Sequence, residues 1–127
     1  MGQNADTLLN HMPDRSGYDI AFEDIRDAQV AAMNERFQEQ AGKIKLVAMR
    51  AKDAGLTEIS SMEDAVALLL PHTAYKSYPE SFLLDEKWDK LTKWLGTVSA
   101  YPTNDTDLES IQGIDEWIER LKAAGHY

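Results

Sequence analysis

The sequence contains no cysteine, and its longest apolar run covers only residues 65–70. Without cysteine, disulfides, thiolate metal ligands and thiol nucleophiles are excluded. A membrane-spanning helix needs roughly 20 apolar residues, so we expect no membrane contact. The N-terminus lacks the basic segment followed by an apolar run that marks a secretory signal. These absences favour a cytoplasmic protein.

Basic residues are also scarce, with 13 Lys and Arg against 22 Asp and Glu, which gives a net charge of -9. An acidic protein repels the phosphates of nucleic acid and of anionic lipid, so neither is an expected partner. Seven glycines and four prolines among 127 residues leave little room for low-complexity linkers. The length fits one domain with a real core. We predict a mobile polar tail at residues 1–17 and a single helical domain at 18–127, continuing into a missing C-terminal part.

Apolar residues recur at three- and four-residue steps, the period of an amphipathic helix, in four separate segments. The pattern predicts one long helix from Ile20 to about Gly55, which Gly42 weakens in the middle, where either a break or a kink fits. It predicts further helices at 62–70, 84–98 and 114–125, the first stopped by Pro71 and buried beyond Ala65. Short helical turns are expected at 80–84 and 108–112. The predicted fold is therefore all-α, with four to five helices in an irregular bundle and one long N-terminal helix.

Motifs for catalysis or cofactor binding are missing. Neither GxGxxG nor a phosphate-loop frame occurs, and no HExxH places two histidines on one helix face. His11, His72 and His126 are far apart in sequence, so a metal site is not predicted. Ser77 and Ser81 have no evident base, and hydroxyls of this kind more often bond the backbone. We predict no catalytic residue, no metal ligand and no cofactor in this chain.

The segment from His72 to Phe82 is the richest in aromatic residues, and two uses for it stay open. Aromatic loops either pack into their own domain or line a pocket or interface. Pro71 and Pro79 frame a stiff connector, which favours packing. The second use predicts residues that face a substrate or a partner: His72, Tyr75, Lys76, Tyr78, Phe82 and Trp117.

Six stretches of the sequence form a recognisable series: Arg36-Phe37, Asp53–Leu56, Ile59–Asp64, Leu69–Phe82, Ile114–Leu121 and Gly125–Tyr127. Together they resemble the N-terminal region of adenylate-forming ligases, specifically phenylacetate–CoA ligase-like proteins and acyl-protein synthetases. The resemblance covers roughly residues 36–127 and implies a helical region that precedes a nucleotide-binding part. The Ser/Thr/Gly-rich phosphate-contacting motif of that family is absent here. ATP and magnesium are therefore expected only in the full-length enzyme, and no catalytic residue carries over.

Two functions follow as hypotheses. The preferred one is an N-terminal helical fragment or subunit of an adenylate-forming acyl ligase, inactive alone and bound to the remainder of the enzyme. The alternative is a stand-alone helical protein-interaction module. In either case apolar aromatic surface favours a protein partner or a homo-oligomer.

Overall fold

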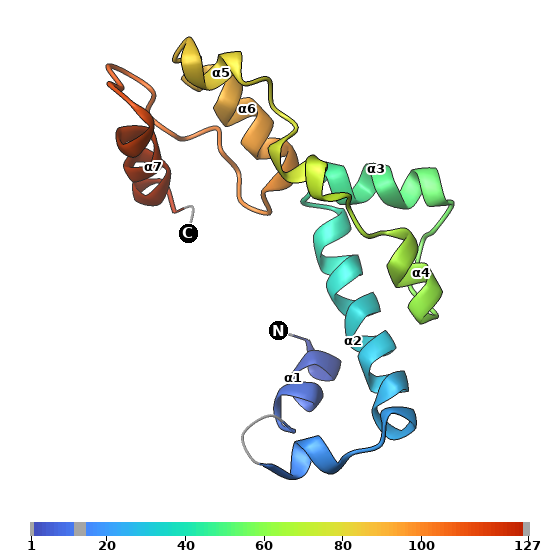
Figure 1. The fold of residues 1–127 in the computed structure, drawn as a ribbon. Coiled ribbons are helices and arrows are strands. Elements are labelled where there is room, and N and C mark those ends of the chain that lie inside the picture. Colours follow the sequence, from blue (N-terminus) through green and yellow to red (C-terminus); the bar gives the residue numbers. More distant parts are fainter. Residues whose placement is uncertain (1, 12–14, 126–127) are drawn as a thin grey trace. The chain divides into compact units, whose positions relative to one another are not determined.

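The computed structural model describes residues 2–11 and 15–125 of the chain, and that part is helical without any strand (Figure 1). The all-α prediction is confirmed. The described residues form seven α-helices and two 3-10 helices, more than the four to five predicted. None of these helices is long and apolar enough to cross a membrane. Contacts group the chain into unit 1, residues 1–42 and 47–69, and unit 2, residues 43–46 and 70–127, where one domain was predicted.

Unit 1 contains the elements α1 (Gln3–Leu9), η1 (Arg15–Asp19), α2 (Phe22–Ala41), most of α3 (Lys45–Ala54) and α4 (Met62–Ala67). Unit 2 contains η2 (His72–Lys76), α5 (Ser81–Leu84), α6 (Trp88–Val98) and α7 (Ile114–Ala123). The predicted single long N-terminal helix is instead two helices, because α2 ends at Ala41 and α3 begins at Lys45, and the interruption lies at Gly42, where the sequence marked the helix as weak. The short turn predicted at 80–84 appears as α5.

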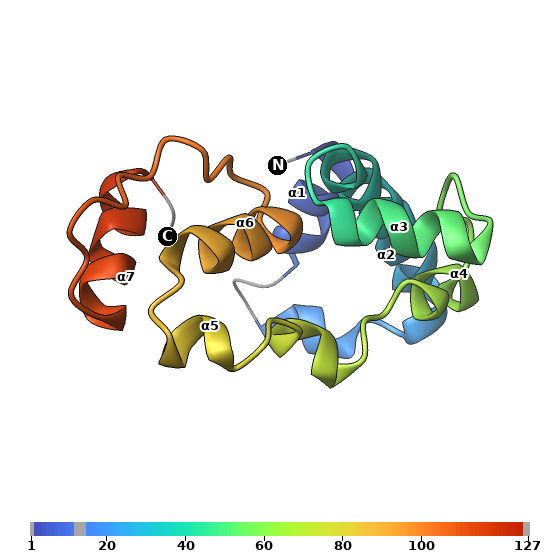
Figure 2. The same ribbon diagram turned by 90° about the horizontal axis from the view of Figure 1, so that it is seen from above.

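Residues 3–9 form helix α1, within the stretch where the sequence predicted a mobile tail. Helix α1 lies against α2 (Figures 1 and 2). The Asn4 backbone N–H donates to the Glu35 carboxylate at 2.9 Å, which satisfies one of the free N–H groups at the start of α1. Residues 12–14 of the predicted tail lie outside the described residues. The sequence did not predict α1, because the Glu35 side chain that accepts from its first turn lies 31 residues away along the chain.

The core of unit 1 forms around Phe37, Ala51 and Ile59, contributed by α2, α3 and the connector before α4. Asn34 on α2 accepts a hydrogen bond from the Ile59 backbone N–H at 2.9 Å through its side-chain oxygen. This bond ties the connector to α2 and holds the Ile59 side chain in the apolar cluster.

Helix α4 begins as predicted and ends earlier than predicted. Ser61 caps it, since its hydroxyl oxygen accepts from the Asp64 N–H at 3.1 Å. Pro71 has no N–H to donate to the Ala67 carbonyl, and Arg50 Nη2 donates instead to the carbonyls of Ala67 and Leu69, both at 3.1 Å. The predicted burial beyond Ala65 is wrong: Val66 is 64% exposed and Leu69 is 65% exposed.

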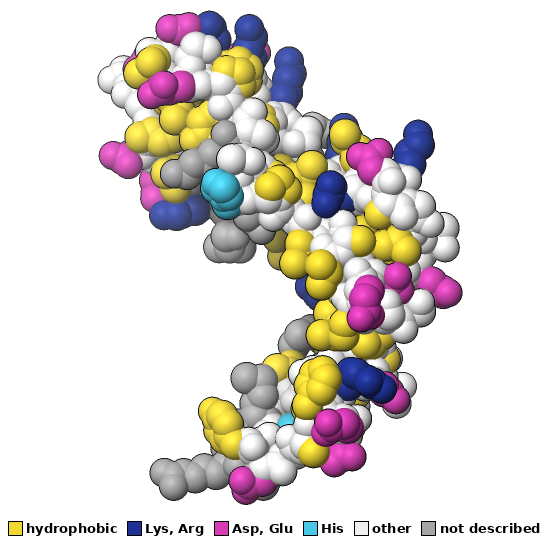
Figure 3. Space-filling view, turned by 45° about the vertical axis from the view of Figure 1, so that its right-hand side comes forward, with side chains coloured by type: hydrophobic (Ala, Val, Ile, Leu, Met, Phe, Trp, Pro, Cys, Tyr) yellow, Lys and Arg dark blue, Asp and Glu magenta, His cyan; other side chains and the backbone are white. Residues whose placement is uncertain are grey.

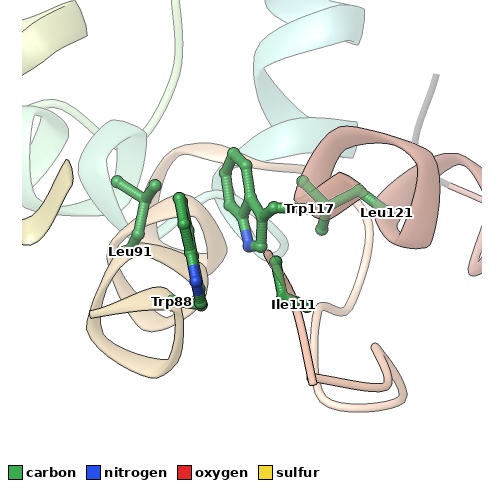
Figure 4. Close-up of a cluster of buried hydrophobic side chains, with 5 residues drawn as sticks. All are labelled: Trp88, Leu91, Ile111, Trp117 and Leu121. Atoms are coloured by element: carbon green, nitrogen blue, oxygen red, sulfur yellow. The ribbon is translucent and has the colours of Figure 1, made fainter. Parts of the chain in front are cut away.

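The core of unit 2 is the five-residue cluster in Figure 4, made of Trp88, Leu91, Ile111, Trp117 and Leu121. The two indole rings stack with centroids 6.3 Å apart and planes 25° apart. The helical turn predicted at 108–112 does not form, because Ser110 has a left-handed φ of 58°. Ile111 instead enters the core from a loop.

Replacing Leu91 by alanine should lower the free energy of unfolding by about 2–5 kcal/mol, since Leu91 is only 2% exposed and a cavity would remain. Lys93→Ala on the same helix is the control. Its side chain is 82% exposed, and the change should stay within about 0.5 kcal/mol. Urea unfolding followed by tryptophan fluorescence measures both. Equal costs for the two variants would contradict the assigned core face of α6.

Gly96→Ala should destabilise unit 2 although alanine favours helices. A methyl group at Gly96 would lie 2.8 Å from Thr103 Oγ1, and that hydroxyl donates to the buried Thr92 carbonyl. Overpacking costs about 1–3 kcal/mol and outweighs a propensity gain of about 1 kcal/mol. Gly42→Ala, where a methyl group meets nothing within 4 Å, should stabilise the chain by about 0.4–1 kcal/mol. Thermal unfolding of both variants measures the two changes in stability. A change of the same sign in both variants would refute the close approach at Gly96.

Candidate functional site

The aromatic segment, defined as residues 72–82, begins with η2 and ends on α5. His72 is exposed at its start. Tyr75 and Lys76 lie in η2, and their side chains are outside the described part of the structure. Tyr78 and Phe82 are half-buried, and both pack against the core of unit 2. Most of the described side chains predicted to face a partner are therefore committed, at least in part, to packing.

Two contacts fasten the middle of the aromatic segment to α6. The Trp94 indole N–H donates to the Ser77 hydroxyl oxygen at 3.0 Å. The Tyr78 ring meets the Trp94 ring edge-on, with centroids 4.6 Å apart and planes 70° apart. An edge-to-face pair of this kind is worth about 0.5–1.5 kcal/mol beyond its buried area. Ser77 thus serves as a hydrogen-bond acceptor for packing, in keeping with the low expectation for it as a nucleophile.

The end of the aromatic segment is held by a turn and by a cation. The Phe82 N–H donates to the Pro79 carbonyl at 2.9 Å, so the chain turns at this proline. Lys90 Nζ lies 5.9 Å from the centroid of the Phe82 ring, within the range of a cation–π contact. Leu84, two residues further on in α5, is a large apolar side chain at 74% exposure.

Trp117 is enclosed in the core at 7% exposure, although it was predicted to face a partner. Its indole N–H donates to Thr92 Oγ1 at 2.8 Å, a buried bond between α7 and α6. Its position is that of a packing residue. The partner-facing role stays a prediction for the exposed His72 and the half-buried Tyr78 and Phe82.

The buried threonines were missed by sequence reasoning. Thr92, Thr103 and Thr106 are at most 9% exposed, although threonine is usually a surface residue. One signal was available: Thr92 follows Trp88 by four residues and so lies on the apolar stripe of α6. Nothing in the spacing of Thr103 or Thr106 marks the loop that carries them as a packed one.

An ion-paired network holds this loop to α7. Arg120 pairs with Asp107 and, at 3.1 Å, with Glu116. A hydrogen bond from the Glu109 N–H, aided by Arg120, lowers the pKa of the Asp107 carboxyl below its ordinary 3.8. The Gln112 N–H and then Arg120 lower the pKa of Glu116 below its ordinary 4.5. Both carboxylates are more stable ionised in the folded state than in the unfolded one.

Acid should weaken unit 2 through these two groups. A carboxyl group whose pKa is lower in the folded state than in the unfolded state stabilises the fold. This stabilisation is fully present above the pKa of the unfolded state and is lost as the pH falls through the pKa of the folded state. We expect the unfolding free energy to decrease as the pH drops below about 4.5. The double variant Asp107→Asn/Glu116→Gln should be less stable at pH 7 and should decline less steeply in acid. Urea titrations at several pH values test this, and parallel pH curves for variant and wild type would disprove the contribution.

The described residues contain no group of three or more His, Asp or Glu placed to hold a metal ion. The aromatic segment has aromatic rings packed on α6. His72 is exposed at its start, and Leu84 is exposed just beyond its end. Binding at such a surface would depend on shape and apolar contact rather than on metal coordination.

Comparison with protein-family models, with curated proteins and with solved structures found no match for this chain.

Proposed function

We propose that this chain is a helical, non-catalytic part of an adenylate-forming acyl ligase. Such an enzyme joins a carboxylic acid to AMP with release of pyrophosphate and then passes the acyl group to a thiol. In this proposal ATP and magnesium bind in the remainder of the enzyme. The helical chain supports that remainder in the cytoplasm.

The observation that carries the proposal is where the resembling stretches lie in the fold. Ile59–Asp64 forms the junction into α4, with Ile59 8% exposed in the core of unit 1 and Ser61 as the helix cap. Leu69–Phe82 forms the junction into α5 and packs on the core of unit 2 through Tyr78 and Phe82. Both stretches position helices, which fits a supporting part better than one that supplies reacting groups.

The side chains proposed to meet the remainder of the enzyme are the exposed ones at the two ends of the aromatic segment. His72 is exposed at its start, and Leu84, two residues beyond its end, offers a large apolar side chain at 74% exposure. An exposed leucine of this kind is the type of apolar side chain that a partner covers.

Affinity capture with the tagged chain, expressed in its source cells, tests the proposal. We expect the captured polypeptide to catalyse ATP–pyrophosphate exchange that depends on a carboxylic acid, and the isolated chain to catalyse none. His72→Ala/Leu84→Ser should recover about tenfold less partner, because both side chains lie on the proposed contact.

Met49→Ser is the matched control, since Met49 is 61% exposed but lies in unit 1. It should recover as much partner as the wild type. Exchange activity in the isolated chain would contradict a non-catalytic role. A captured partner without acid-dependent exchange would contradict the ligase assignment.

A stand-alone interaction module is the second candidate, favoured by the exposed apolar side chains. Figure 3 shows apolar side chains on the surface among charged ones. On α7, Ile114 is 40% exposed and Ile118 is 38% exposed. Capture of a partner through Leu84 without acyl-adenylate chemistry is the result expected for this second function.

A further inference from the structure

Unit 1 contains an open groove between α2 and the start of α4, which we call the α2–α4 groove. Its volume is about 690 Å³. Phe22 and Val30 line it from α2 and Met62 from α4, all with apolar side chains. Phe22 is 54% exposed, and Val30 and Met62 are half-buried. Since Phe22, Arg26 and Val30 follow one another at four-residue steps, one face of α2 forms this wall.

The charge of the groove is negative. Asp27 and Glu63 line it on its two sides, and Arg26 is the only cation among its lining residues. Arg26 Nε lies 3.4 Å from Asp27 Oδ1, so these two charges partly compensate each other and Glu63 leaves the lining with an excess of negative charge. Glu23 and Asp24, in the first turn of α2, make the start of this helix acidic as well. The groove therefore combines apolar side chains with an excess of negative charge.

We propose that the α2–α4 groove binds a basic amphipathic helical segment of another polypeptide. The leucine-type side chains of such a segment would cover Phe22, Val30 and Met62, and its lysines or arginines would meet Asp27 and Glu63. Helix-in-groove recognition uses anchors at three- and four-residue steps, which matches the spacing along α2. The exposed Phe22 ring adds a face for a cation. This inference is independent of the proposed ligase role.

Charge complementarity selects this occupant over others. An acidic segment would place like charges against Asp27 and Glu63, and such contacts are repulsive. A second copy of this chain carries the same net charge of -9, so its approach is opposed as well. A basic segment gains attraction from the groove and from the acidic protein as a whole, and salt weakens that gain.

Fluorescence anisotropy with three labelled peptides tests the proposal. The probe is an amphipathic leucine–lysine helix, and the comparison peptides replace its lysines by glutamate or its leucines by serine. We expect saturable binding of the leucine–lysine peptide alone, weakened by salt. Phe22→Ser and Asp27→Lys/Glu63→Lys should each lower the affinity by about tenfold.

Matched controls separate the groove from general charge. Asp53→Lys/Glu58→Lys reverses two exposed acids of unit 1 outside the groove lining, and Leu84→Ser removes an exposed leucine of unit 2. Both controls should change the affinity by no more than about twofold. Circular dichroism confirms that each variant is folded.

Three results would overturn the proposal. One is equal binding of the leucine–glutamate peptide. Another is an affinity that falls as much in the controls as in the groove variants. The third is self-association in sedimentation that Phe22→Ser abolishes, because a second copy of the chain would then occupy the groove.

Discussion

Inside unit 2 the hydroxyl oxygen of Thr92 accepts a hydrogen bond from the indole N–H of Trp117, and the placement of α7 depends on that buried contact. The backbone carbonyl of the same threonine accepts the Thr103 hydroxyl at 3.3 Å. One residue of α6 thus holds both the following helix and the loop that leads to it. A buried polar group that loses its partner costs about 1–3 kcal/mol, so neither bond is easily exchanged for another arrangement. The need to satisfy these groups also explains why Trp117 faces inward.

Local pattern was enough to predict the helices and part of the core. The helical period over residues 84–98 predicted α6, whose buried face contains Trp88 and Leu91, and Gly42 marked the weak point between α2 and α3. These features depend on residues close together in sequence, where periodicity and backbone preference act. The partition into two units and the helix at residues 3–9 depend on contacts between distant residues, which no local pattern records.

The candidate site was predictable in outline only. The sequence singled out the aromatic segment and left open whether it packs or binds. Tyr78 and Phe82 pack on the core through rings and bonds supplied by α6, among them the indole of Trp94. The choice between the two uses depends on which side chains α6 presents to the segment, and that is decided by tertiary structure. The acidic groove of unit 1 escaped notice because its two walls are separated by about thirty residues of sequence.

The end of α4 has a consequence for how unit 1 takes shape. Arg50 lies on α3, upstream of the carbonyls of Ala67 and Leu69 that it binds. A chain leaving the ribosome therefore makes the Arg50 donor before it makes the carbonyls that accept from it. Pro71 prevents the helix from continuing, but the carbonyls at its end gain their partner only once α3 and α4 meet, so this end of α4 becomes fully hydrogen-bonded as a result of docking. Lysine in place of Arg50 would keep the charge but lose the planar guanidinium donors, and the carbonyls at the end of α4 would be held less well without any change in α4 itself.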